Sequence, residues 1–143
     1  MRISTKGKYS LIALLYIALL DKGVYASASE ISTATGISEG YLEQLFIELR
    51  KAGIIQSVRG PQGGYYLDKE PKNISAGDIL RSVEGSLSPA ECVDSMVCPK
   101  EQSCLTWNTW NLLNSSIKNF VDSISLADLI DDYDANKDPE YEI

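Results

Sequence analysis

The stretch that decides the fold is SASEISTATGISEGYLEQLFIELRKAG, residues 27–53. Ser27 and Glu30 have the spacing of a capping box, which predicts that a short helix begins here. Gly36 tolerates the positive φ of a tight turn, and Ser38 is placed to cap a second helix. Two short helices joined by a glycine turn make a helix-turn-helix. Four apolar side chains are expected to pack the pair together: Ile31, Ile37, Leu42 and Leu45.

The segment that follows, IIQSVRGPQGGYYL (residues 54–67), reads as two short strands joined by a tip rich in glycine and proline. A hairpin directly after the second helix of such a pair is a wing, and this one carries Arg59 at its tip. The sequence therefore predicts a winged helix-turn-helix DNA-binding domain over residues 1–72. The fold class is mainly α with a small β-hairpin wing (α+β).

An apolar run near the N-terminus, residues 11–20, has basic flanks but no small-residue cleavage site after it. It is too short to cross a bilayer. We expect instead a helix over about residues 5–21 in a cytoplasmic protein without membrane contact. Its core-facing residues are predicted to be Ile12, Leu15 and Leu19.

Charge is distributed unevenly along the chain, whose net charge is −7. Residues 1–72 hold nine Lys and Arg against seven Asp and Glu, whereas residues 73–143 hold four against thirteen. This balance permits DNA contact through one end only. The chain contains no histidine, and we find no nucleophile–base pair and no glycine-rich phosphate loop between a strand and a helix. We therefore predict that it is not an enzyme.

The second half divides into a linker helix with a cysteine loop (73–102), a long helix (103–124), and a short helix with an acidic tail (125–143). Apolar residues of the long helix recur at alternating steps of three and four and form one seam. Such a helix lacks an obvious partner in its own chain, so we expect it to pack against its copy in a homodimer. The seam residues are Trp110, Leu113, Ile117, Phe120 and Ile124.

Several side chains are suited to contact double-stranded DNA. Glu43 can accept a hydrogen bond from cytosine N4, and Gln44 can pair with adenine. Ser38 and Tyr41 are suited to phosphates, and Arg59 to a narrow minor groove. Each of them taken alone is equally consistent with an ordinary surface residue.

Three thiols, Cys92, Cys98 and Cys104, stand six residues apart. Structural zinc sites favour closer cysteine pairs and four ligands, and redox-active cysteines favour a C-x-x-C spacing. Iron–sulfur clusters take soft thiolates at varied spacings. The pattern favours an iron–sulfur cluster, with zinc, redox chemistry and inert thiols as the alternatives.

The motifs MRISTKGKYS, SEGYLEQLFIELRKAGII, SVRGPQGGYYL and CLTW, with the cysteine triad, resemble the IscR/NsrR/CymR family of winged-helix repressors over about residues 1–130. The resemblance to IscR implies a repressor of iron–sulfur cluster assembly genes that senses cluster supply through a [2Fe-2S] cluster. It assigns iron to the three cysteines. It also assigns DNA contacts to six residues: Tyr41, Glu43, Gln44, Ser57, Arg59 and Gly60.

The chain departs from that family pattern at Trp107, which stands where IscR proteins have a histidine ligand. An indole N–H is a donor only and does not ligate iron. Lys8 stands where NsrR proteins have a ligating aspartate. The fourth ligand is therefore open, between a partner residue, an exogenous thiol or water, and a nearby oxygen from Asp94, Glu101, Ser103, Thr106 or Asn108. A [4Fe-4S] cluster is open as well.

A second reading comes from CymR, which lacks the cysteine triad and acts by docking onto cysteine synthase. The segment ISAGDILRSVEGSLSPAE (residues 74–91) resembles CymR as closely as it resembles IscR. The terminal EYEI, ending in Ile143, resembles the serine acetyltransferase tail that enters the cysteine synthase active site. The alternatives are thus a regulator of cysteine metabolism that binds cysteine synthase through its tail, or a frayed chain end.

Overall fold

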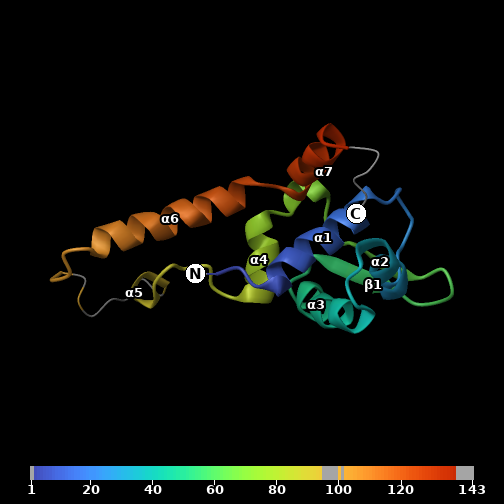
Figure 1. Ribbon diagram of the computed structural model, residues 1–143, viewed down its shortest axis with the longest axis horizontal. Helices are drawn as coiled ribbons and strands as arrows, with labels where there is room; N and C mark the ends of the chain where they lie inside the picture. Colours follow the sequence, from blue (N-terminus) through green and yellow to red (C-terminus); the bar gives the residue numbers. More distant parts are fainter. Residues whose placement is uncertain (1, 95–99, 101, 138–143) are drawn as a thin grey trace.

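The computed structural model describes residues 2–94, 100 and 102–137 (Figure 1). None of the helices in this part of the chain is long and apolar enough to cross a membrane. The elements, in order, are α1 (Thr5–Leu19), α2 (Ala28–Thr35), α3 (Glu39–Lys51), β1 (Ile55–Val58), β2 (Gly64–Leu67), the 3-10 turn η1 (Pro71–Asn73), α4 (Ala76–Glu84), α5 (Glu91–Asp94), α6 (Trp107–Ser123) and α7 (Leu126–Ala135).

The helix-turn-helix forms as the caps predict. The Ser27 hydroxyl accepts a hydrogen bond from the Glu30 N–H (3.1 Å), and the Glu30 carboxylate accepts one from the Ser27 N–H (2.7 Å). Gly36 ends α2 in the left-handed conformation (φ 76°), where a side chain would be strained. The Ser38 hydroxyl then accepts from the Tyr41 N–H (3.3 Å) and caps α3. These contacts set the angle between the two helices.

The wing is a two-stranded antiparallel hairpin in which Ile55 pairs with Leu67 and Val58 with Gly64. The segment before α2 adds an isolated bridge, since the Tyr65 N–H donates to the Ala26 carbonyl (2.7 Å). A Cβ at residue 64 would collide with the Ala26 backbone, so glycine permits this approach. The predicted class, mainly α with a small β-hairpin wing, is confirmed.

The core lies between α1, the helix-turn-helix and the base of the hairpin. Its largest fully buried side chains include Leu14, Ile31, Leu42, Phe46, Leu49 and Ile55. The prediction that Ile12, Leu15 and Leu19 belong to the core is wrong: Ile12 is 39 % exposed, and the other two are only half-buried and lie outside the core cluster. Ser10, Ala13, Leu14 and Ile17 form the buried stripe of α1. At about 100° per residue, Ile12 falls on the opposite side of the helix.

The core continues beyond residue 72, since Ile79 of α4 and Leu126 of α7 belong to the same cluster. Two backbone hydrogen bonds hold the start of α4 to the start of α7: the Ala76 N–H donates to Ile124 (2.7 Å), and the Leu126 N–H donates to Ile74 (2.8 Å). We call α1–α4, the hairpin and α7 the body of the molecule. Within it, the short final helix completes the packing of the DNA-binding fold.

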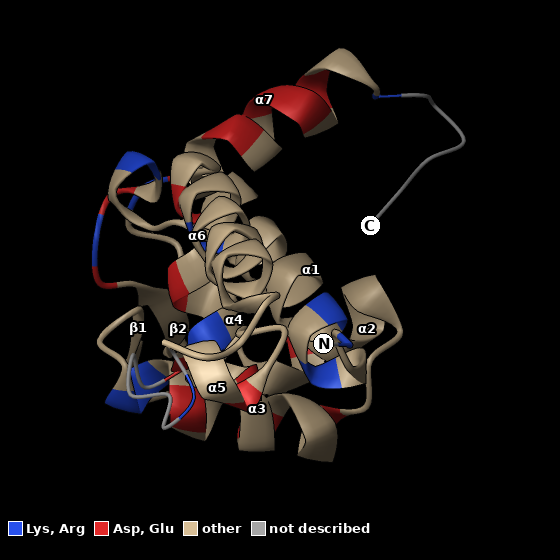
Figure 2. Ribbon diagram, turned by 90° about the vertical axis from the view of Figure 1, so that its left-hand side faces the viewer, with Lys and Arg blue, Asp and Glu red and all other residues tan. Residues whose placement is uncertain are grey.

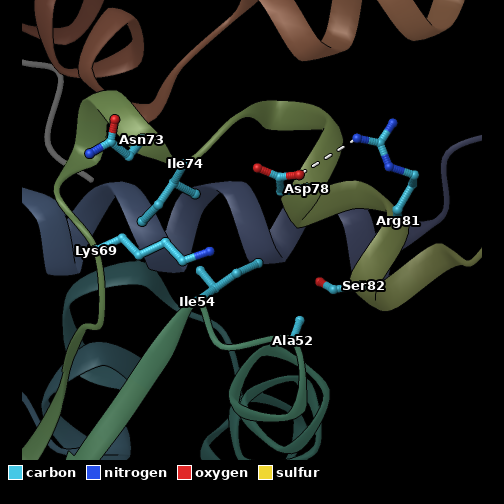
Figure 3. A pocket seen from close by; sticks show the side chains of 8 residues that line it. All are labelled: Ala52, Ile54, Lys69, Asn73, Ile74, Asp78, Arg81 and Ser82. Atoms are coloured by element: carbon cyan, nitrogen blue, oxygen red, sulfur yellow. Dashed lines mark ion pairs between the residues drawn. The ribbon is translucent and has the colours of Figure 1, made fainter.

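Arg81 ties α4 to the long helix α6. Its guanidinium lies 3.6 Å from Asp78 within α4 and forms a second ion pair with Asp122 near the end of α6. Figure 3 shows Arg81 and Asp78 at one side of a hollow of about 340 Å³, with Lys69 on its other side. The two carboxylates hold Arg81 at the base of α6.

We call α5 and α6 the arm. α6 projects away from the body (Figure 1) and has no buried residue. It begins at Trp107, four residues later than the predicted start at Ser103. The reason is local: the Cys104 N–H donates to the Lys100 carbonyl in a turn (2.7 Å), and Thr106 has non-helical backbone angles.

Candidate functional site

Most side chains on the outward face of α3 are polar, as a recognition helix requires. Glu43 and Gln44 are both exposed, as predicted for base-reading residues. Tyr41 is half-buried, and its ring packs edge-on against Tyr9 at 5.6 Å. The hydroxyl of Ser38 caps the helix, so the group predicted to hold a phosphate already has a structural task.

The wing presents its tip to solvent. Ser57, Arg59 and Gly60 are all exposed, and within the described residues no carboxylate forms an ion pair with Arg59. Gly60 has φ 118°, and its carbonyl accepts a hydrogen bond from the Gly63 N–H (3.0 Å). A tip this narrow can approach the floor of a groove.

The wing and α3 are held as one unit by an aromatic contact. The rings of Phe46 on α3 and Tyr65 on β2 lie 4.4 Å apart, and Phe46 is fully buried. Because the hairpin follows α3 directly, the helix and the tip cannot shift independently without breaking this contact. The predicted DNA-contacting residues therefore share one rigid support.

Glu84, at the end of α4, is a residue that the sequence reasoning missed. One of its carboxylate oxygens accepts hydrogen bonds from the Ser4 N–H (2.8 Å), the Ser4 hydroxyl (2.6 Å) and the Gly7 N–H (2.9 Å). Burial raises the pKa of Glu84, but these bonds outweigh burial and hold the pKa below its ordinary value. The only signal was an acidic residue in the last turn of a helix, where the dipole disfavours it.

Of the three thiols, Cys92 and Cys104 lie within the described residues, and both are free. Cys92 is half-buried on α5, next to the fully buried Val93. The Asn114 side chain donates to the Val93 carbonyl (3.2 Å), which holds α5 against α6. Cys98 lies outside the described residues.

Cys104 lies exposed in the turn before α6. A hydrogen bond of 3.6 Å joins its sulfur to the Thr106 hydroxyl, and this bond lowers the pKa of the thiol below its usual value. The Thr106 backbone N–H and the charge of Lys100 act in the same direction. The turn thus favours the thiolate, which is the form that binds metal.

Trp107 follows as the first residue of α6. Its indole N–H is buried and has no hydrogen-bond partner among the described residues. A buried donor without an acceptor is costly, so this position suits a ligand or partner that supplies one.

The candidate fourth ligands do not converge. Asp94 accepts a hydrogen bond from the Ser86 hydroxyl, and the Thr106 hydroxyl accepts one from the Trp110 indole (3.2 Å). The Ser103 hydroxyl donates to the Lys100 carbonyl (3.3 Å), and the Asn108 side chain is exposed. Among the residues that the structure describes, no three His, Cys, Asp or Glu side chains gather into a metal-binding group. Glu101 lies outside them.

The residues of the predicted seam on α6 differ in burial. Ile117 and Ile124 are half-buried, whereas Trp110, Leu113 and Phe120 are exposed. Leu112, which the sequence reasoning left out of the seam, is 68 % exposed. The structure therefore leaves an apolar face on α6 that the body does not cover.

Charge separates as the composition suggests. Figure 2 shows basic segments at the start of α1, where Lys6 and Lys8 lie, and acidic segments along α7. α7 carries four aspartates in ten residues. DNA contact is therefore favoured at the end of the body that holds the start of α1.

Residues 3–132 match the model of the Rrf2 family, described as an iron-dependent transcriptional regulator. The chain is 41 % identical over 132 residues to the HTH-type transcriptional regulator IscR of Aliivibrio salmonicida (strain LFI1238), covering 92 % of this chain and 79 % of the relative. It is 39 % identical over 134 residues to IscR of Yersinia pestis, covering 94 % and 82 %.

Two solved structures show the same likeness. T. potens IscR superimposes with a TM-score of 0.77 at 38 % identity, over 99 % of this chain and 94 % of that one. CymR, the global cysteine regulator of B. subtilis, gives a TM-score of 0.75 at 37 % identity, over 92 % and 97 %. The chain belongs to the Rrf2 family, and it is a DNA-binding transcriptional regulator, not an enzyme.

Proposed function

We propose that this chain is a homodimeric repressor of iron–sulfur cluster assembly genes that senses cluster status through a cluster held by Cys92, Cys98 and Cys104. The observation that carries the proposal is the thiol loop, residues 92–104, which lies in the sequence between the DNA-binding body and the long helix. Its relatives named IscR support the assignment to cluster-linked regulation.

The two described thiols fit an iron–sulfur cluster by their chemistry. Both are free, and the Cys104 turn favours the thiolate. Soft thiolates are the ligands that iron–sulfur clusters prefer. Three residues after Cys104, Trp107 adds a buried N–H that has no acceptor within the described part of the chain. Hydrogen bonds to cluster sulfurs are among the features that set cluster potentials. When bound, the cluster would report to the protein that iron–sulfur clusters are available in the cell.

The exposed apolar face of α6 supports the homodimer. α6 has no fully buried residue, and its exposed apolar side chains are Trp110, Leu112, Leu113 and Phe120. Large exposed apolar patches mark interaction surfaces, and a symmetric copy presents the same face. Two copies pair the two winged domains for the two half-sites of an operator.

A path of direct contacts leads from the thiol loop to the DNA-binding surface. Asn114 holds α5 to α6, Arg81 holds α6 to α4, and Glu84 holds the end of α4 to the start of α1. A ligand that orders the loop in one arrangement shifts the population only by its difference in affinity between two states. We expect these contacts to couple the arrangement of the loop to the position of the DNA-binding surface.

The test is binding of DNA from promoters of cluster assembly genes, measured with protein loaded anaerobically and with cluster-free protein. We expect tight binding by the loaded form and loss of that difference in Cys104→Ala. Gln102→Ala is the matched control, since it changes an exposed neighbouring side chain that is neither a thiol nor a candidate ligand. Equal binding by loaded and cluster-free protein would contradict the proposed sensing.

The likeness to CymR favours a second candidate, a regulator of cysteine metabolism that binds cysteine synthase. Ile143, the residue proposed to enter the enzyme, lies outside the described residues. Removal of residues 138–143 should abolish binding to cysteine synthase if the tail carries it, with Lys137→Ala as the control. An undiminished complex would eliminate the tail from this candidate.

A further inference from the structure

The outward face of the recognition helix carries a large apolar side chain that the DNA contacts described so far do not use. Ile47 on α3 is 53 % exposed, more than Ile12, Val24 or Val58 elsewhere in the body. An isolated apolar side chain on a surface is common. Its position on this helix is what makes it informative.

Ile47 stands at the centre of the solvent face of α3. The helix buries Leu42, Leu45, Phe46 and Leu49. At about 100° per residue, position 47 lies roughly opposite that stripe. It follows Glu43 by four residues and Gln44 by three, so the three side chains share one face. Any DNA groove that receives Glu43 and Gln44 also receives Ile47.

An isoleucine has no hydrogen-bonding group, so it cannot read the donors and acceptors of base edges. The apolar group that a base pair presents in the major groove is the C5-methyl of thymine. We propose that Ile47 contacts this methyl group and selects thymine at one position in each half-site. The proposal rests on the proposed binding of α3 in the major groove.

The helix geometry also predicts where that thymine lies. Three to four residues along α3 span about 5–6 Å, which corresponds to about one and a half base steps of 3.4 Å. The position read by Ile47 is therefore one or two base pairs from the positions read by Gln44 and Glu43. Ile47 and Gln44 also border a shared hollow of about 280 Å³ with Lys6 and Tyr41, which places Ile47 next to the basic start of α1.

The first step of the test is enrichment of a random double-stranded DNA library by the purified, anaerobically loaded protein. Wild type, Ile47→Ala and the control Val24→Ala, an exposed apolar residue outside α3, are compared. We expect Ile47→Ala to lose the preference for thymine at one position per half-site and to keep the rest of the motif. Val24→Ala should select the wild-type motif.

The second step removes only the methyl group. Thymine at the affected position is replaced by uracil in the selected DNA. Loss of one buried methyl contact corresponds to about a fourfold weaker affinity, and roughly fifteenfold when both half-sites lose it. We expect this loss in the wild type and no loss in Ile47→Ala, because the methyl then has no partner.

The outcomes separate the inference from the function on which it rests. If no sequence is enriched by the wild type, specific DNA binding itself fails and the inference fails with it. If a motif is enriched and Ile47→Ala selects the same motif, only the inference is overturned. A change in the oligomeric state of Ile47→Ala, measured by sedimentation, would assign the side chain to a protein contact and would overturn it as well.

Discussion

The body and the arm of this molecule treat apolar side chains in opposite ways. In the body, Phe46 is 1 % exposed and packs between α3 and the hairpin. In the arm, Phe120 is 66 % exposed on a helix without a single buried residue. The two phenylalanines of the chain therefore show the difference directly. The body buries its apolar side chains within one copy, whereas the arm leaves an apolar face exposed, as expected for the proposed homodimer.

The two regions are therefore expected to serve different functions. The body holds its predicted DNA-contacting residues on a rigid support that needs no partner. The arm carries Cys92 and the exposed apolar face, and in the proposed function these contact the cluster and the second copy. A regulator built this way can change its arm in response to a ligand while its DNA-binding surface stays folded.

The largest expected effect is on stability, when phenylalanine is replaced by alanine once in the body and once in the arm. Phe46→Ala should destabilise the body by about 3–5 kcal/mol, because it opens a cavity in the core. Phe120→Ala should change monomer stability by less than about 0.5 kcal/mol, as surface substitutions usually do. Urea unfolding at low protein concentration measures both. Equal losses would show that the arm is packed against its own chain.

The next effect concerns the arm alone. Leu112→Ser combined with Phe120→Ser should weaken dimer association by about 3 kcal/mol, or roughly a hundredfold in Kd, because central apolar contacts dominate interface energies. Sedimentation equilibrium measures it, and circular dichroism checks that the body stays folded. Ser116→Ala on the same helix is the control. An unchanged dimer would assign the apolar face to another partner.

A smaller effect concerns the body alone. Arg59→Ala should reduce operator affinity by about ten- to a hundredfold, because a specific arginine contact is worth about 1–3 kcal/mol. The operator affinity of Arg59→Lys should lie between those of the wild type and Arg59→Ala, since lysine keeps the charge but lacks the planar guanidinium group. Fluorescence anisotropy with labelled operator DNA measures both. The dimer should be unaffected, and a change in sedimentation would show that body and arm are not separable in this way.

The smallest effect is pH-dependent and concerns the anchor between α4 and α1. Glu84→Gln should lower stability by about 1 kcal/mol at pH 7, because three hydrogen bonds to a carboxylate are replaced by weaker ones at a partly exposed site. The folded-state pKa of Glu84 is depressed, so its contribution is present above the unfolded pKa and is lost as pH falls through the folded pKa. The stability gap between the two proteins should therefore close below about pH 4.5. A gap that does not narrow at all as the pH falls from 7 into the acid range would contradict the ionic anchor.

Local signals in the sequence predicted most of the body. Ser27 and Ser38 were each predicted to cap a helix, and the hydroxyl of each accepts a hydrogen bond from a backbone N–H three residues later. Such signals are short-range, because a cap and its partner stand three residues apart. The glycine turn and the hairpin were predicted correctly for the same reason, since their signals also lie within a few residues.

The errors came from features that depend on distant contacts. Ile12 was placed in the core, yet which side of α1 is buried is decided by the helices that pack against it. Glu84 was missed because its partner, Ser4, lies eighty residues away in the sequence.

The central claim is that the three thiols hold an iron–sulfur cluster, and its most direct test is made on protein purified strictly without oxygen. Visible and EPR spectra, with iron and sulfide content per chain, are measured for the wild type beside Cys92→Ala. We expect a chromophore with matched iron and sulfide in the wild type and its loss in the variant. A colourless wild type that also resists reconstitution would contradict the account and favour the cysteine-metabolism regulator.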